Sequence, residues 1–347
     1  MLNTEKTVLS PQIAEKIEQL HQDKIRLNKE KIDYFGYLDI DDHGFIYFPD
    51  FTFEPITHED GRVYGMKMLG DNYRKILNEM PVYCNTASAL ATCWPGNLST
   101  WMEIGFRKEN EPEFLYPIYE KYNILQSGCG GMNHLCPDLT IGLRLGWKGL
   151  LEKVRYYKEL NVHCDVSFYE GEEQLLLGVL EWIGRHVDYA KKMAETAETE
   201  ELREHYIQVA EVNEALLNHP PRTLREACQF TAHFQCIDRM YYAGGALGQI
   251  DELFRPFYEK DKEIGGLTDE EAVWYFASLF FNDTHYSQIG GLTPSGDADM
   301  VSRVSFLVLD AVHYLKIPSN VAIRVHDSMN ETLLRRSLEY NMEDGTG

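Results

Sequence analysis

Two glycine-rich stretches are the segments of this chain best suited to hold a ligand. One runs from His285 to Asp299 and contains three glycines, a proline and several small polar residues. The other runs from Tyr241 to Gln249 and places three glycines after two tyrosines. Because glycine has no side chain, the backbone of such stretches can approach a ligand closely. A plain surface connection, or a helix C-cap in the second stretch, is the alternative interpretation.

A third stretch carries side chains that bind metals. Cys129, His134, Cys136 and Asp138 combine soft and hard ligands within ten residues. A structural zinc site normally takes four ligands, and the seven cysteines include no C-x-x-C pair. Structural cysteines explain the pattern better, and a metal-dependent enzyme is kept as an alternative. No G-x-S-x-G, P-loop or G-x-G-x-x-G motif is present, so serine hydrolase, NTPase and Rossmann interpretations have no anchor.

The composition is typical of a soluble globular protein. Among 347 residues, 44% are hydrophobic and 25% charged. The net charge of −22 repels phosphate backbones and anionic membranes, so we expect neither nucleic-acid nor membrane binding. No apolar run approaches the roughly 20 residues of a membrane span, and no signal peptide is evident. We therefore expect a cytoplasmic protein, and the odd number of cysteines favours free thiols.

Helical patterns position the two glycine-rich stretches. Ser10 and Pro11 predict the start of a helix that runs to about Ile32. Capping boxes are predicted at 223–226 and 268–271, the second ahead of an apolar run at 273–281 that should be buried on every side. Further helices are predicted over 140–160, 173–197 and 201–217.

The chain after the second capping box alternates between helix and strand. Asp297 or Asp299 is predicted to cap a helix that contains Val301 to Val312. Residues 320–325 then read as a short strand, and Ser328 to Glu331 as a capping box for a closing helix. This order predicts an α/β, helix-rich fold.

Four collinear segments carry a resemblance to a known family. Gly248-Gln-Ile-Asp-Glu-Leu-Phe-Arg-Pro-Phe-Tyr-Glu-Lys-Asp261 resembles a segment of the glycyl radical enzymes of the pyruvate formate-lyase-like family that reads G-R-[FL]-D-Q-Y-L-x-P-[FY]-Y-E-x-D. Residues 130–153 are similar to its G-H-x-x-P-D-[FY] and L-G-[LF]-x-G-I-x-E segment. Residues 290–299 are similar to its G-G-x-x-x-D-G-x-D-A loop, with Ser295 in place of aspartate, and residues 321–326 to its L-S-V-R-x-H strand.

The resemblance implies a fold and a chemistry. Family members hold a radical on a C-terminal glycine loop and relay it to a cysteine inside a barrel of two half-barrels. It implies one pyruvate formate-lyase-like domain over 1–347, with 1–60 as a candidate peripheral N-terminal segment. We expect the N-terminal part of such a barrel, with half-barrel strands surrounded by helices and the barrel incomplete in this chain.

The expected function is that of the N-terminal part of a lyase-type glycyl radical enzyme acting on a small organic substrate. The family's thiyl cysteine and R-V-x-G-[FY] glycine motif have no counterpart in this sequence. We therefore expect a chain that is truncated at its C-terminus and inactive alone, with no cofactor bound directly. The expected partners are a radical-SAM activating enzyme, which installs the glycyl radical, and either a second copy or a complementary C-terminal chain. A non-catalytic domain that binds a ligand or a subunit is the alternative.

The resemblance also implies where a substrate lies. Members that act on diols carry N-G-H-S ahead of the segment matched by 248–261, and this chain has no such histidine or serine there. The expected substrate-binding residues are Tyr241, Tyr242, Ala243, His285, Gly290 and Gly291. We expect Asp251 and Arg255 to hold the chain in place.

Overall fold

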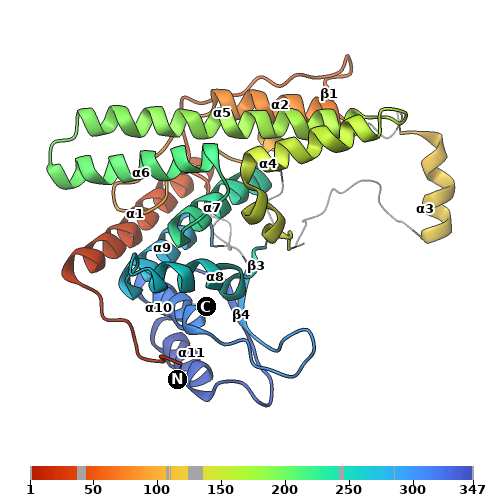
Figure 1. The fold of residues 1–347 in the computed structure, drawn as a ribbon. Helices are drawn as coiled ribbons and strands as arrows, with labels where there is room; N and C mark the ends of the chain where they lie inside the picture. The colour runs from red at the N-terminus through yellow and green to blue at the C-terminus, as the bar shows by residue number, and fades with distance from the viewer. Residues whose placement is uncertain are drawn as a thin grey trace.

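The computed structural model describes residues 2–36, 44–106, 109, 111–123, 136–241, 246–284 and 286–345. Helices dominate it, as predicted (Figure 1). They are α1 (Pro11–Phe35), α2 (Met66–Glu79), α3 (Tyr116–Tyr122), α4 (Leu139–Leu160), α5 (Ser167–Glu195), α6 (Glu200–Asn218), α7 (Leu224–Tyr241), α8 (Ile250–Glu263), α9 (Asp269–Asn282), α10 (Arg303–Leu315) and α11 (Glu331–Asp344), with 3-10 turns η1 (Leu98–Thr100) and η3 (Glu113–Leu115).

A parallel sheet joins the three segments that follow α7, α9 and α10. Its strands are β3 (Gly248–Gln249), β4 (Ser287–Gly290) and β5 (Val321–Arg324), in that order. Gln288 lies beside Gln249 on one strand and Ala322 on the other. A second, two-stranded sheet pairs β1 (Arg62–Val63) with β2 (Glu103–Ile104). The α/β prediction is therefore confirmed, and so is the strand predicted at 320–325.

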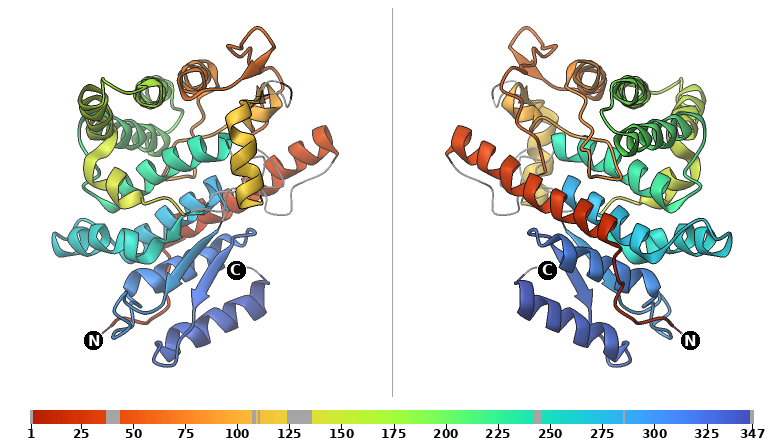
Figure 2. Two further views of the ribbon diagram at one scale, coloured as in Figure 1. Left: turned by 90° about the vertical axis from the view of Figure 1, so that its right-hand side faces the viewer. Right: turned by 90° about the vertical axis from the view of Figure 1, so that its left-hand side faces the viewer.

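The two faces of the three-stranded sheet differ. Ile289 and Val321 are buried, and Ile323 packs against the same core. Because side chains alternate between faces along a strand, Ala322 and Arg324 lie on the opposite face, where both are exposed. Figure 2 shows α10 and α11 beside the strands and the longer helices stacked above them. One face of the sheet therefore belongs to the core, and the other is open.

A buried irregular segment lies between the helices that support the sheet. Residues 87–94 are buried without forming helix or strand, as predicted for this part of the chain. Buried backbone needs hydrogen-bond partners, and side chains provide them here. Gln229 of α7 bonds both the amide and the carbonyl of Ala91, at 2.8 and 3.0 Å. Trp274 of α9 donates to the carbonyl of Ala87 at 2.7 Å, which ties the apolar helix α9 to this segment.

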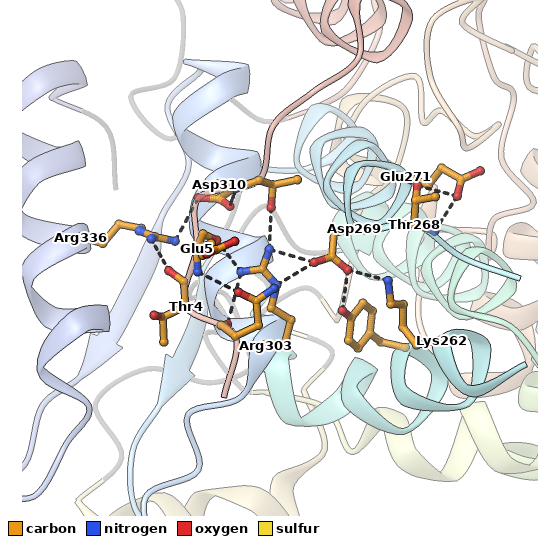
Figure 3. Close-up of polar contacts among 12 residues, drawn as sticks. Thr4, Glu5, Lys262, Thr268, Asp269, Glu271, Arg303, Asp310 and Arg336 are labelled. Atoms are coloured by element: carbon orange, nitrogen blue, oxygen red, sulfur yellow. Dashed lines mark hydrogen bonds and ion pairs between the residues drawn. The ribbon is translucent and has the colours of Figure 1, made fainter. Parts of the chain in front are cut away.

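The N-terminal residues form a strap along α10 (Figure 3). Arg303, in the first turn of α10, donates to the carbonyl of Glu5 at 2.7 Å and to the hydroxyl of Thr7 at 3.0 Å. The buried carboxylate of Asp310 accepts from the backbone amide of Thr7 at 2.9 Å. Two charged side chains on one helix therefore hold the strap in register.

The same network reaches two neighbouring helices. Arg336 of α11 donates to the carbonyl of Thr4 and lies 3.7 Å from Asp310. On the other side, Arg303 pairs with Asp269 of α9 at 2.9 Å, and Lys262 of α8 pairs with Asp269 at 3.0 Å (Figure 3). The strap thus links the chain's first residues to the helices that cover the sheet.

Some of the predicted helix starts are confirmed, and others are wrong. Thr268 and Glu271 form the capping box of α9 as predicted, and Ser10 precedes α1, which extends to Phe35. The prediction that Asp297 or Asp299 caps α10 is wrong, because Ser302 is the N-cap there. The capping box predicted at Ser328 is also wrong, because the side chain of Asn330 accepts from Leu333 and caps α11.

Two expectations from composition bear on the described residues. All six cysteines within them are free thiols, as expected: Cys84, Cys93, Cys136, Cys164, Cys228 and Cys236. Among the helices described, none has the length and apolar character needed to cross a membrane.

A buried histidine in α5 makes the stability of the helical layer depend on pH. His186 is fully buried, and its Nδ1 donates to the carbonyl of Trp182 at 3.0 Å. Its Nε2 has no hydrogen-bond partner. Burial lowers the pKa of His186 from 6.5 to about 4. The folded protein therefore holds the ring neutral where an unfolded chain would bind a proton.

We predict that His186→Gln weakens the pH dependence of stability. The contribution of the neutral ring is complete above pH 6.5 and is lost as the pH falls towards about 4. Between pH 7 and pH 5, the free energy of unfolding of the variant should therefore fall by about 2 kcal/mol less than that of the wild type. Urea titrations at both pH values measure this difference. His163→Gln, at an exposed position, is the control and should keep the wild-type pH dependence; equal pH dependence in all three proteins would contradict the prediction.

Candidate functional site

The predicted glycine loop begins as a strand. Residues 287–290 of the stretch from His285 to Asp299 form β4 at the centre of the sheet, so its interpretation as a loop throughout was wrong. The strand is short and ends in glycine, which hides its alternating pattern in the sequence. The turn begins at its carboxyl end, where Gly290 and Gly291 have φ angles of 70° and 101°. Ligands of open parallel sheets commonly bind at the carboxyl ends of the strands.

Asp251 fixes this end of β4. Its buried carboxylate accepts from the amide of Gly290 at 2.8 Å, from the hydroxyl of Ser305 at 2.5 Å and from the amide of Glu252 at 3.0 Å. Burial raises the pKa of Asp251, and these hydrogen bonds oppose that effect. One side chain therefore joins the starts of α8 and α10 to the end of β4. Asp251 has the supporting role expected for it, and Arg255 makes an ion pair with Glu252 at 2.8 Å.

Arg324 and Gln249 extend this arrangement across the open face of the sheet. Gln249, on β3, donates to the carbonyl of Gly290 at 2.7 Å. Arg324, at the end of β5, donates to the side-chain oxygen of Gln249 at 2.8 Å. The guanidinium group of Arg324 also lies over Gly291, where an added Cβ would be 2.8 Å from its central carbon. An exposed cation is thus held at the carboxyl end of the strands.

A hollow of about 300 Å³ lies beside the other end of the same sheet. This volume is at the small end of the range for ligand pockets. The residues that line it come from all three strands and from the segment before α4: Cys136, Ala246, Gly248, Tyr286, Ser287, Gln288, Asn320 and Ala322. The hollow combines apolar surface with a phenol, two amides and a thiol. Such a set can orient a small polar molecule but contains no charged group.

The predicted substrate-binding residues are spread over this region. Gly290 and Gly291 lie at the carboxyl end of β4, and Tyr241 is the last residue of α7, with 37% of its surface exposed. None of these three lines the hollow. Tyr242, Ala243 and His285 lie outside the described residues.

Sequence reasoning did not select Tyr286, Gln288, Gln249 or Arg324. Along β4, Ser287 and Ile289 lie on one face, so Gln288 lies on the other. This alternation could identify Gln288 only after β4 was recognised as a strand. As to a metal, no cluster of three or more His, Cys, Asp or Glu side chains suited to an ion occurs in the described part of the chain. Cys129 and His134 lie outside that part.

The family can now be identified. Residues 123–347 match the family model described as pyruvate formate lyase-like. Because the match spans well over half of the chain, this chain belongs to the pyruvate formate lyase-like family. The match covers all three strands of the sheet, Asp251, Gly290 and Gly291, so the resemblance drawn from the four segments is confirmed.

Two relatives show the similarity in sequence. The chain is 28% identical over 179 residues to the 4-hydroxyphenylacetate decarboxylase glycyl radical subunit of Clostridioides difficile. The alignment covers 48% of this chain and 19% of the relative. The chain is also 30% identical over 182 residues to isethionate sulfite-lyase of Bilophila wadsworthia. That alignment covers 44% of this chain and 21% of the relative. The aligned parts thus amount to about a fifth of each relative.

Two solved structures show the similarity in fold. A glycyl radical enzyme from Archaeoglobus fulgidus superposes with a TM-score of 0.69 at 17% identity, over 96% of this chain and 50% of that one. A structure from Roseburia inulinivorans that concerns 1,2-propanediol dehydration superposes with a TM-score of 0.71 at 17% identity, over 99% of this chain and 50% of that one. The chain thus spans half the length of these structures. The prediction that it forms part of a glycyl-radical-enzyme-type fold is confirmed.

We predict that Gly291→Ala disrupts the site, because φ at Gly291 is positive and the new Cβ would collide with Arg324. The free energy of unfolding should fall by about 1–3 kcal/mol, as measured by urea titration. The matched control is Gly184→Ala in α5, where an added Cβ meets no atom within 4 Å. That substitution should stabilise the helix by about 0.5–1 kcal/mol. A neutral or stabilising effect of Gly291→Ala would contradict the positive φ angle of Gly291.

Proposed function

We propose that this chain is the N-terminal part of a glycyl radical enzyme of the lyase type that acts on a small organic substrate. The observation that carries the proposal is the parallel sheet of a family member with one open face. Asp251 fixes the carboxyl end of its central strand, and the open face borders a small hollow. By name, one relative in the comparison is the glycyl radical subunit of a decarboxylase, and the other is a sulfite-lyase. The shared scaffold alone does not choose among such reactions.

The radical chemistry requires residues that we expect outside these 347 residues. In the complete enzyme, a glycyl radical supplies hydrogen-atom abstraction through a cysteine thiyl. We propose that a radical-SAM activating enzyme installs that radical, and that a second copy or a complementary C-terminal chain completes the assembly. This chain would contribute a wall of the substrate chamber, and a cytoplasmic location would suit an oxygen-sensitive radical.

The chain's own residues set the proposed substrate contacts. Tyr241, Tyr242, Ala243 and His285 are proposed to face the substrate, with Gly290 and Gly291 admitting it close to the backbone. Gln288 and Tyr286 add hydrogen-bonding groups at the hollow. The lack of the N-G-H-S motif removes polar partners for a diol, whereas the tyrosines offer aromatic surface and phenolic hydroxyls. We therefore propose a substrate other than a short diol.

Electron paramagnetic resonance of the complete gene product tests this function. We expect a glycyl-radical doublet after anaerobic incubation with its activating enzyme and S-adenosylmethionine, and no doublet when S-adenosylmethionine is left out. The proposal is contradicted if an activating enzyme that installs a radical on its own cognate protein produces no doublet in this gene product. That result would favour a non-catalytic ligand-binding or subunit-binding domain.

A substitution at the hollow tests the proposed substrate contacts separately from radical formation. Gln288→Ala should lower kcat/KM about tenfold or more, because it removes a hydrogen-bonding group from the chamber wall. The yield of the glycyl radical should stay at the wild-type value. Gln22→Ala, on the exposed side of α1, is the control and should change neither quantity. Unchanged kcat/KM in Gln288→Ala would place the substrate away from this face.

A further inference from the structure

A second hollow lies between α1 and the start of α6. Its volume is about 340 Å³, and it shares no residue with the hollow beside the sheet. It is lined by α1, by the segment at Thr86 and Ala87, and by the first turns of α6: Gln12, Glu15, Lys16, Gln19, Thr86, Ala87, Thr199, Glu201, Leu202 and His205. Most of these side chains are polar or charged, so any ligand of this hollow would be bound through polar contacts.

Lys16 is the cation of this hollow. Only 21% of its side chain is exposed, and its ammonium group lies 4.6 Å from the centre of the Trp274 ring. The nearest carboxylate, on Glu201, is 4.0 Å away and is also held by the amide of Gln12 at 2.8 Å. Burial lowers the pKa of Lys16, with Glu201 opposing this and Arg225 adding to it. A half-buried cation whose ion pair is loose retains hydrogen-bonding capacity for an added anionic group.

His205 adds a hydrogen-bond acceptor. It is 6% exposed, and its Nε2 lies 3.2 Å from the carbonyl of Asn85, so Nε2 must carry the proton. Nδ1 then carries a lone pair and no proton. Among the described residues it has no hydrogen-bond partner, and it is not one of the polar atoms sealed away from solvent. Because His205 lines the hollow, this accessible lone pair is the acceptor that the histidine can offer a ligand there.

The histidine stays neutral in the physiological range. Burial, together with the neighbouring charges of Arg225 and Lys16, lowers the pKa of His205 to about 4, with the Asn85 carbonyl and Glu201 opposing the shift. Arg225 is 8% exposed, and its Nη2 has no hydrogen-bond partner. The backbone of α6 adds its own field, since the N-terminus of a 19-residue helix favours negative charge. Lys16, the nearby Arg225 and the start of α6 therefore each contribute positive potential near the hollow.

Negative charge also lines the hollow, close to Lys16. Glu15 and Glu201 both line the hollow. A simple anion would meet these two carboxylates, and a simple amine would meet Lys16 and the field of Arg225. We infer that the hollow binds a small zwitterion of the α-amino acid class. Its carboxylate would pair with Lys16 near the start of α6, and its ammonium group would donate to His205 Nδ1 and to Glu201.

Calorimetric titration of the purified full-length protein tests this site. The probe is L-glutamine, because its side chain is uncharged and only its ammonium and carboxylate groups are charged. We expect a Kd of about 1 mM or tighter. Acetate and n-butylamine, which each carry one of the two charges, should bind at least about tenfold more weakly.

Two substitutions separate this site from the rest of the molecule. Lys16→Gln should weaken the binding of L-glutamine about tenfold or more, because it removes the partner of the carboxylate. The matched control, Lys191→Gln, removes an exposed lysine of α5 that pairs with Glu214, and should bind like the wild type. Circular dichroism and thermal melting establish that both variants fold.

Three results would overturn the inference. The first is no binding of L-glutamine to the wild type at concentrations of about 10 mM. The second is equal binding of acetate or n-butylamine, which would leave a site for a single charge. The third is loss of L-glutamine binding in Gln288→Ala but not in Lys16→Gln, which would place the ligand at the sheet.

Discussion

The carboxylate of Asp251 is the interaction on which the arrangement of the candidate site depends. It accepts from the Gly290 amide and the Ser305 hydroxyl at 2.8 and 2.5 Å while fully buried. Ser305 in turn accepts from the amide of Ser302 at 3.0 Å, so the carboxylate and the cap of α10 form one network. A buried carboxylate without such partners would cost several kcal/mol. The requirement to satisfy Asp251 therefore keeps two helix starts and the end of β4 together.

The same network determines the geometry of the open face of the sheet. Gly290 and Gly291 turn the chain at the end of β4, Gln249 bonds the carbonyl of Gly290, and Arg324 lies over Gly291. The opposite face joins the core to which α8 and α10 also contribute, and the N-terminal strap is bound to α10 through Arg303. This firmly held face is the one that we propose as a wall of the substrate chamber.

Much of the fold could be predicted from the sequence, because the helices have strong periodicity and one strong capping box, at Thr268. The family could be predicted from four short segments. Local sequence patterns gave wrong predictions where tertiary contacts determine the structure. Asp297 and Asp299 look like caps, but the chain reaches α10 at Ser302, and Asp299 instead accepts from the amide of Asn330 at 2.8 Å. Strand β4 was hidden because four residues ending in glycine carry little periodicity. The hollow beside the sheet combines residues more than 180 positions apart, from Cys136 to Ala322, and no local pattern joins them.

Hydrogen exchange of the segment 286–291 tests the central claim that Asp251 fixes the end of β4. Because the Gly290 amide is bonded to a buried carboxylate, it should exchange as slowly as amides in the middle of α9, and far more slowly than those in the exposed turn at 294–298. In Asp251→Ala, the segment 286–291 should exchange at rates close to those of that turn while α9 stays protected. Rapid exchange of 286–291 in the wild type, or unchanged protection in Asp251→Ala, would contradict the account.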